Sequence, residues 1–297
     1  GPIDALPVSD ALSDAAPLAA PAPLSGTQTA PSTASSPSAL PGKLALAGAD
    51  GSIVLYEPAS GQARRLTGGF DPAISPDGSK IAFLRGGAGL FVIDADGGNE
   101  RQLYGGGEEM RAPAWSPDGQ SIAFSRVNGQ DSCRSLGFGI CLPDNPQLAQ
   151  YPLVRKDLRT LSRIGLDGED FQDIPTLDTA TAPSWTTTGI VYQSNSGLQI
   201  TQDGAERDKE GNLVNRALTR EYLHRDPAWR PDGGRIALMD ANPNHQEIYA
   251  INPDGSGLAA LTRPRSALLE RLPHSVAPAW SPDGQHIAFL SNRDGAW

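Results

Sequence analysis

The sequence has little of several features that define common protein classes. Its 297 residues include two cysteines, two methionines and 6% aromatic residues, and no run of eighteen apolar residues occurs. Without such a run, the sequence predicts no membrane span. Two cysteines can form one bridge at most, so a scaffold held mainly by disulfides is also excluded.

Basic residues are also in short supply. The chain has 24 Lys and Arg against 34 Asp and Glu, for a formal net charge of −10. Such a balance repels the phosphate backbone, so we expect no nucleic-acid partner. The one basic run, within 155–163, is followed by acidic residues at 167–173 and indicates a solvated strand edge.

Catalytic and cofactor signatures are missing as well. The sequence has no Gly-x-Ser-x-Gly elbow, no Walker-type glycine loop ending in Lys-Ser or Lys-Thr, and no His-Glu-x-x-His. We therefore expect no enzymatic activity and no cofactor from the residues given.

The first 42 residues have a composition that disfavours a folded core. Of these, 28 are Pro, Ala, Ser or Thr, and only Asp4, Asp10 and Asp14 carry charge. A segment of this kind cannot bury enough apolar surface to offset the entropy lost on ordering. We predict a disordered tether over 1–42 and a folded domain over 43–297.

A repeated motif dominates the rest of the chain. It reads DPAISPDGSKIAF at 71–83, APAWSPDGQSIAF at 112–124, APSWTTTGIVY at 182–192, DPAWRPDGGRIAL at 226–238 and APAWSPDGQHIAF at 277–289. The first proline of each copy is followed by the next after 41, 70, 44 and 51 residues. A period of about 40 to 50 residues with short strands is typical of propeller blades.

Each copy has the chemistry of a tight hairpin. Ser-Pro-Asp-Gly suits a type I turn, and apolar strands stand on both sides of it. We assign the motif an architectural role, in which the tryptophans pack between blades and Asp-Gly turns the chain. The residues concerned are Pro76, Asp77, Gly78, Trp115, Pro117, Asp118, Gly119, Trp185, Trp229, Pro231, Asp232, Gly233, Trp280, Pro282, Asp283 and Gly284.

A second Asp-Gly hairpin follows in each complete copy, as in LFVIDADGGNERQL and IYAINPDGSGLAAL. Two hairpins make a four-stranded antiparallel blade. The sequence thus divides into a partial blade at 43–70, blades at 71–110, 111–180, 181–225 and 226–275, and a partial blade at 276–297. In the third copy Thr186–Thr188 replaces the Pro-Asp turn, which predicts a shorter inner hairpin.

The Ser-Pro-Asp-Gly strand pairs resemble the WD40-like repeat of TolB-type β-propellers of bacterial envelopes. The resemblance covers 43–297 and implies an all-β propeller of six four-stranded blades. About five blades and a part are present here, because 43–67 lacks a first strand and the chain stops after two strands of its last copy. We favour an incomplete six-bladed ring. The alternative is a five-bladed ring, closed when the strand at 277–280 completes the first sheet.

The two cysteines, Cys133 and Cys141, lie in a glycine-rich insertion. Eight positions apart, they can close a small disulfide ring in an oxidising compartment, or remain free thiols. A zinc site needs more ligands than this pair supplies.

Loop lengths indicate where binding takes place. In a four-stranded blade, the connections from the second to the third strand and from the fourth to the next blade lie on one face. The long connections of this chain fall there, including the insertion at about 128–157, and we call it the long-loop face. Because binding residues are usually on loops of a rigid scaffold, we expect a protein partner or envelope polymer to bind there.

These features favour a non-enzymatic, monomeric binding scaffold outside the cytoplasm, in the periplasm or at the cell surface. The location follows from the tether, which suits a preceding anchor, and from the resemblance. One alternative is the N-terminal propeller of a larger serine peptidase or other hydrolase. Another is a metal-dependent polysaccharide lyase, for which the candidate ligands are His224, His245 and His274. Solvated loop histidines are the simpler interpretation of those three.

Overall fold

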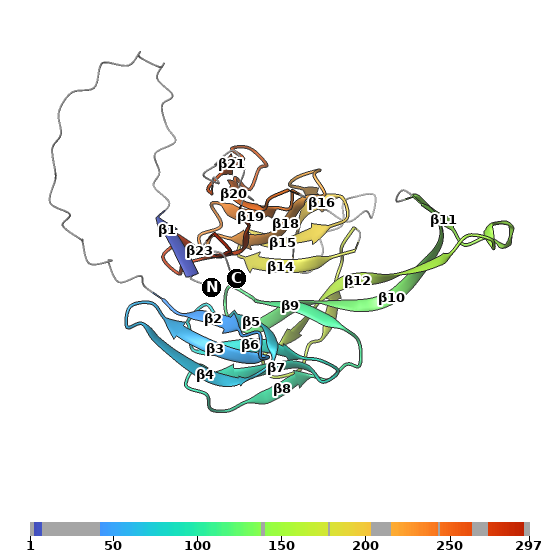
Figure 1. Cartoon of the computed structure of the whole chain (residues 1–297). Helices are drawn as coiled ribbons and strands as arrows, with labels where there is room; N and C mark the ends of the chain where they lie inside the picture. Colours follow the sequence, from blue (N-terminus) through green and yellow to red (C-terminus); the bar gives the residue numbers. More distant parts are fainter. Residues whose placement is uncertain are drawn as a thin grey trace, which may run out of the picture.

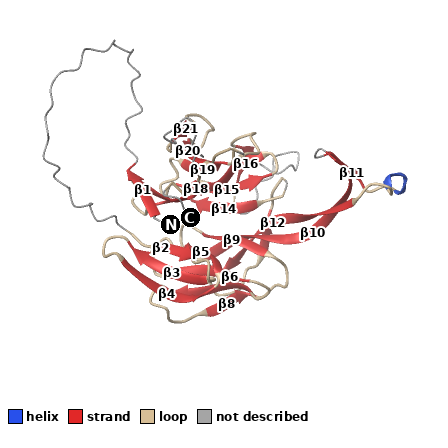
Figure 2. Ribbon diagram, in the orientation of Figure 1, coloured by secondary structure: helices blue, strands red, loops and turns tan. Residues whose placement is uncertain are grey.

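The computed structural model describes residues 3–7, 42–137, 140–177, 179–202, 215–242, 244–262 and 273–293. Almost all regular structure in these ranges is strand, and a single 3₁₀ turn, η1 (Pro146–Leu148), is the only helical element there (Figure 2). None of the described segments forms a helix with the length and apolarity needed to cross a membrane.

Six antiparallel sheets follow one another in chain order around a common centre (Figure 1). The first strand of each sheet contacts the first strand of the next, from β2 through β5, β9, β14 and β18 to β22. This radial arrangement is a β-propeller, which confirms the fold predicted from the repeat.

The blades are numbered along the chain, with an incomplete sheet at each end. The first sheet holds β2 (Leu44–Ala47), β3 (Ser52–Glu57) and β4 (Gln62–Gly68). Blade 1 holds β5 (Phe70–Ile74), β6 (Lys80–Arg85), β7 (Gly89–Asp94) and β8 (Arg101–Tyr104). Blade 2 holds β9 (Met110–Trp115), β10 (Ser121–Gly137), β11 (Ile140–Pro143), β12 (Leu153–Gly165) and β13 (Gln172–Ile174).

The second half continues the pattern. Blade 3 holds β14 (Thr181–Thr186), β15 (Gly189–Ser194), β16 (Gly197–Thr201) and β17 (Arg216–Ala217). Blade 4 holds β18 (His224–Trp229), β19 (Ile236–Asp240), β20 (Glu247–Ile251) and β21 (Ala259–Ala260). The last sheet holds β22 (Ser275–Trp280), β23 (His286–Ser291) and β1 (Ile3–Pro7).

The repeated Ser-Pro-Asp-Gly turns are held by their own side chains. In blade 1 the Asp77 carboxylate accepts hydrogen bonds from the Ser75 hydroxyl (2.6 Å) and the Ser79 amide (3.0 Å). Blade 2 repeats the first of these bonds between Ser116 and Asp118 at 2.6 Å. Blade 3 has the shorter turn expected from its sequence, since Thr186 pairs directly with Gly189.

The tryptophans of the motif join neighbouring blades. Trp115 donates its indole N–H to the carbonyl of Ala73 in the preceding blade (2.9 Å). Trp280 does the same to Ala228 (3.1 Å). Trp115 also packs in an apolar cluster that spans blades 1 and 2 and includes Leu90 and Phe124. Each blade is therefore stabilised mainly by the blade beside it.

Each inner strand carries a bulge that the sequence analysis did not predict. The residue before the repeat proline has a positive φ of 46° to 54° in every copy. Pairing with the second strand shifts register at the same place, where the proline cannot donate a ladder hydrogen bond. The five residues are Asp71, Ala112, Ala182, Asp226 and Ala277.

The two incomplete sheets remain separate. β22 pairs with β23 and not with β2, so the described residues do not form the closure in which the last strand completes the first sheet. The two sheets approach each other, and Trp280, Pro282 and Leu44 line a small cavity of about 50 Å³ between them.

The segment Ile3–Pro7, which the sequence places in the tether, pairs antiparallel with β23 from Ile3 opposite Leu290 to Pro7 opposite His286. It occupies the edge that a third strand covers in the complete blades. The remainder of the predicted tether, at 8–41, lies outside the described residues.

Candidate binding face

The connections assigned to the long-loop face contact one another in the structure. The Val127 amide donates to the Glu109 carbonyl (3.0 Å), which joins the base of the blade 2 insertion to the loop between β8 and β9. The Ala241 amide donates to the Leu223 carbonyl (2.8 Å), and Ser275 donates to Gln246 (2.8 Å). The first two bonds close the first hairpins of blades 2 and 4, and the third joins blade 4 to the last sheet. Residues 263–272, in the long connection before β22, lie outside the described residues.

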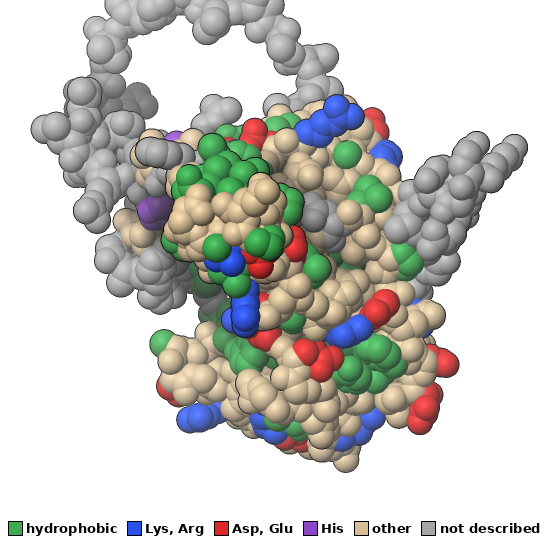
Figure 3. All heavy atoms as spheres, turned by 90° about the vertical axis from the view of Figure 1, so that its right-hand side faces the viewer, with side chains coloured by type: hydrophobic (Ala, Val, Ile, Leu, Met, Phe, Trp, Pro, Cys, Tyr) green, Lys and Arg blue, Asp and Glu red, His purple; other side chains and the backbone are tan. Residues whose placement is uncertain are grey.

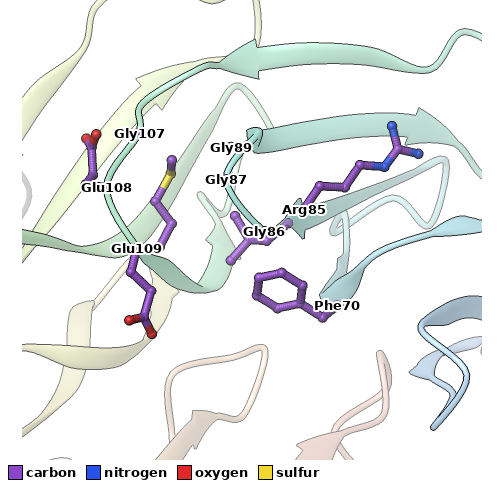
Figure 4. Close-up of a pocket in the computed structure, with 10 residues that line it drawn as sticks. Phe70, Arg85, Gly86, Gly87, Gly89, Gly107, Glu108 and Glu109 are labelled. Carbon is purple, nitrogen blue, oxygen red and sulfur yellow. The ribbon is translucent and has the colours of Figure 1, made fainter.

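A pocket of about 160 Å³ opens on this face between blades 1 and 2 (Figure 4). Much of its wall is glycine backbone, from the turn between β6 and β7 and from the loop before β9. Gly89 is required there, because its φ is +113° and a Cβ would collide with the Tyr104 carbonyl oxygen. The lining residues are Phe70, Leu84, Arg85, Gly86, Gly87, Gly89, Gly107, Glu108, Glu109 and Met110.

The charged side chains around the pocket are directed away from its centre, and the Phe70 ring lies between them (Figure 4). The Arg85 guanidinium bonds Glu100 (2.6 Å) and the Gly68 carbonyl (2.9 Å). Glu108 accepts a hydrogen bond from the Tyr104 hydroxyl (2.8 Å) and lies 3.8 Å from Arg126. The interior is therefore mainly apolar side chain and glycine backbone.

Glu109 is held by two arginines. Arg111 lies at 3.0 Å and Arg159, at the base of the insertion, at 2.9 Å. The hydrogen bond from Arg111, followed by the charge of Arg159, lowers the pKa of Glu109 below its usual range. Glu109 therefore stays ionised near neutral pH, which is unfavourable for a general acid.

The sequence analysis did not predict a second network of hydrogen bonds and ring contacts, which lies next to the pocket. Arg126 donates to both carboxylate oxygens of Asp173 (2.9 Å each) and to the Ser162 hydroxyl (2.8 Å). Phe171 stacks on Tyr104 with ring centroids 4.8 Å apart. The two members of each contact are 36 to 67 positions apart in the sequence, so no local motif predicts them.

The insertion of blade 2 is a β-ribbon that projects from the propeller, and we call residues 128–158 the arm (Figure 1). β10 and β12 pair from the blade out to Arg134 opposite Leu153, with one shift of register between Val127 and Gly129, and β11 pairs on the other side of β10. A disulfide joins Cys133 on β10 to Cys141 on β11. The 3₁₀ turn η1 lies near the tip (Figure 2).

The three candidate metal ligands lie on the long-loop face but do not form a metal site. His224 starts β18 and is buried, and this burial lowers the pKa of its imidazole. His245 lies 3.9 Å from Glu247, and the His274 amide donates to Asn292 (2.7 Å). Across the described part of the chain, no three His, Cys, Asp or Glu residues gather as metal ligands would.

Comparison with known proteins supports the fold. No family model matches the sequence. The Tol-Pal system protein TolB of Alcanivorax borkumensis is 34% identical over 89 residues, which are 30% of this chain and 19% of that protein. The uncharacterized peptidase YuxL of Bacillus subtilis is 32% identical over 107 residues, 33% of this chain and 15% of that protein. The matched region is thus less than a fifth of either relative.

A solved structure gives the longer match. The putative TolB from Agrobacterium tumefaciens aligns with a TM-score of 0.58 at 17% identity, over 83% of this chain and 84% of that one. At this identity the likeness concerns the fold alone. The similarity extends over nearly the whole of both chains, as expected if the blades are arranged alike.

Proposed function

We propose that this TolB-like β-propeller is a non-enzymatic scaffold, which binds a protein partner outside the cytoplasm through its long-loop face. The observation that carries this proposal is the pocket between blades 1 and 2, with its glycine walls and outward-directed charges. The extracytoplasmic location is supported by the relative from the Tol-Pal system and by the Pro/Ala/Ser/Thr-rich beginning of the sequence.

The size of the pocket favours a protein partner over a small molecule. Its volume of about 160 Å³ is well below the roughly 300–1,000 Å³ of typical small-molecule sites. It suits one apolar side chain, which is how protein interfaces commonly anchor a partner. Phe70 and Met110 would contact such a side chain, while the charged groups would form a polar rim.

The ion pairs also favour binding over catalysis. The carboxylates nearest the pocket, Glu108 and Glu109, are already engaged by Tyr104, Arg111, Arg126 and Arg159. The hydrogen bond from Arg111 and the charge of Arg159 lower the pKa of Glu109, which makes that carboxylate a weak base.

Filling the pocket tests the proposal. Gly107 has no positive φ, and a Cβ added there meets no atom within 4 Å, so Gly107→Trp should fold while blocking the cavity. Gln120→Trp places the same side chain at an exposed turn on the opposite face and is the matched control. Tagged proteins would be used to recover partners from a cell-envelope extract. We expect Gly107→Trp to lose a partner that the wild type and Gln120→Trp both retain; equal recovery by all three contradicts the proposal.

A second candidate function is favoured by the similarity to the peptidase YuxL. In that case the propeller would be one domain of a hydrolase and would control access to a separate catalytic domain. The sequence of the whole gene decides between the two. A Gly-x-Ser-x-Gly elbow within an α/β pattern beyond the propeller would favour the hydrolase.

A further inference from the structure

The edge of β12 that faces away from β10, which we call the outer edge of the arm, has no strand beside it over most of its length in the described part of the chain. β12 pairs with β10 along its whole length, but β13 covers its other side only at Leu161–Arg163. The Arg159 carbonyl then accepts the Ala180 amide (3.0 Å), and from Leu158 to Leu153 no strand is paired there. An edge with unpaired amides and carbonyls is a template for another strand.

The arm also exposes an unusual share of apolar surface. Six of the eleven large apolar side chains that are exposed in the described residues lie on it. Figure 3, in which the arm points toward the viewer, shows apolar side chains gathered there beside charged ones. The six are Ile140, Leu142, Tyr151, Leu153, Val154 and Leu158.

Pairing positions show that these side chains occupy both faces of the ribbon. Leu153 lies opposite Arg134, and Val154 lies opposite Cys133, so consecutive residues of β12 point to opposite faces. A thin ribbon has no core of its own, and the exposure of these side chains shows that neither face is covered by the propeller. Apolar groups displayed in this way mark an interaction surface.

We propose that β12 pairs with β12 of a second copy of this chain, antiparallel about a two-fold axis at Lys156. In this register Arg155 of each copy faces Asp157 of the other, and Val154 faces Leu158. Both Arg155–Asp157 pairs are opposite in sign and the apolar side chains meet across the joint, and the one like-charge contact is that of Lys156 with its own copy on the axis. Shifting the axis to Asp157 sets Arg155 opposite Arg159, and shifting it to Arg155 sets Val154 opposite Lys156. The axis at Lys156 is therefore the complementary one.

The backbone allows the same register. The Arg159 carbonyl is directed to the outer edge, because it accepts the Ala180 amide there. Amides and carbonyls of alternate residues point to the same edge in an antiparallel strand, so those of Asp157 and Arg155 do too. These two residues therefore form a hydrogen-bonded pair across the axis.

Size and geometry predict a weak dimer in which the two propellers lie on opposite sides of the joint. The joint involves about five residues of each copy, 154–158, because the Arg159 carbonyl that would face Leu153 already accepts the Ala180 amide. It therefore falls at the small end of specific interfaces. Leu161, where β12 enters the blade, is five residues from the axis. At about 3.4 Å per residue, the two copies of Leu161 lie about 34 Å apart. The monomer expected from the sequence would then be the state at low concentration.

Reciprocal charge variants test the proposal. Arg155→Asp makes two like-charge pairs in a dimer of itself, and so does Asp157→Arg. A mixture of the two variants restores opposite charges at both pairs. We expect wild-type full chain to associate between low micromolar and near-millimolar concentration in sedimentation velocity. Each single variant should associate about tenfold more weakly, and the mixture should recover.

Two further variants complete the design. Lys156 faces itself across the axis, so Lys156→Thr should strengthen association by removing a like-charge pair. Arg65→Asp, an equal charge change on an exposed residue of β4 outside the arm, should have no effect. A wild type that stays monomeric throughout overturns the proposal, as does a dimer that the variants leave unchanged or a mixture that does not recover. The pocket at Gly107 is untouched by these changes, so the proposed partner site is tested separately.

Discussion

At the scale of single residues, the repeat tryptophans show how one sequence position acquires different partners. Trp115 and Trp229 are both almost fully buried, with 6% and 5% of their surface exposed. The indole N–H of Trp115 donates to Ala73 (2.9 Å), whereas that of Trp229 has no hydrogen-bond partner among the described residues. We therefore expect the tryptophan of the motif to contribute differently to the stability of the two blades.

Replacing each of these tryptophans with phenylalanine measures the difference. Both changes remove similar volume, but Trp115→Phe also leaves the Ala73 carbonyl without its donor. Trp229→Phe removes a buried N–H that has no partner. We expect Trp115→Phe to lower the free energy of unfolding by about 1–2 kcal/mol more than Trp229→Phe does. Urea denaturation of the two variants checks this, and equal losses would show that the indole hydrogen bond contributes little.

At the scale of elements, the arm differs most from its sequence-based description. The sequence indicated a glycine-rich loop with a candidate disulfide, and the structure has three paired strands with Cys133 and Cys141 joined across two of them. The basic run at 155–163 was interpreted as a solvated strand edge, and the structure places it in β12, where Arg155 and Lys156 are exposed. Arg159 instead pairs with Glu109, and Arg163 lies opposite Gln172 of β13. The interpretation therefore holds only for the first part of the run.

The disulfide should stabilise the arm and leave the propeller unaffected. A bridge that closes a ring of this size limits local opening more than global unfolding. We expect the variant Cys133→Ser with Cys141→Ser to exchange amide hydrogens faster in β11 and the outer half of β10. Peptides from β15 and β16 serve as the internal reference in hydrogen-exchange mass spectrometry. Unchanged exchange in β11 would mean that strand pairing alone holds the arm.

At the scale of the whole molecule, the repeated turns place similar carboxylates in several blades. Asp77 accepts hydrogen bonds from the Ser75 hydroxyl and the Ser79 amide, and these lower its pKa from 3.8 to about 2. A hydrogen bond from the serine two residues earlier is also the main cause that lowers the pKa of Asp118 and Asp283. The ionised forms therefore favour the folded state.

Acid should weaken this contribution in a definite window. Because the folded pKa is lower than the unfolded value of about 3.8, the stabilisation is complete above that pH and is lost as pH falls toward about 2. The triple variant Asp77→Asn, Asp118→Asn, Asp283→Asn keeps the side-chain shape but does not titrate. Between pH 5 and about 2, its free energy of unfolding should fall less steeply than that of the wild type. Parallel slopes in denaturation at each pH would contradict this.

The propeller was predictable because its signals are local. Ser116, Pro117, Asp118 and Gly119 specify a turn within four residues, and the recurrence of that turn specifies the blades. The TolB-like architecture expected from these repeats is confirmed. The positive φ at residues such as Ala112 was missed, since alanine gives no local sign of a left-handed conformation.

The sequence by itself determined the all-β class, the order of the blades and the side on which most long connections lie, because turn chemistry and strand alternation act between near neighbours. The connection at 202–215, from the third to the fourth strand of blade 3, is an exception and belongs to the other side. Only the tertiary structure decided which side chains surround the pocket, how Arg126 meets Asp173, and that the arm leaves the edge of β12 uncovered. Those features join residues that are distant in the chain. Their contacts exist only once the blades are packed, so no local pattern records them.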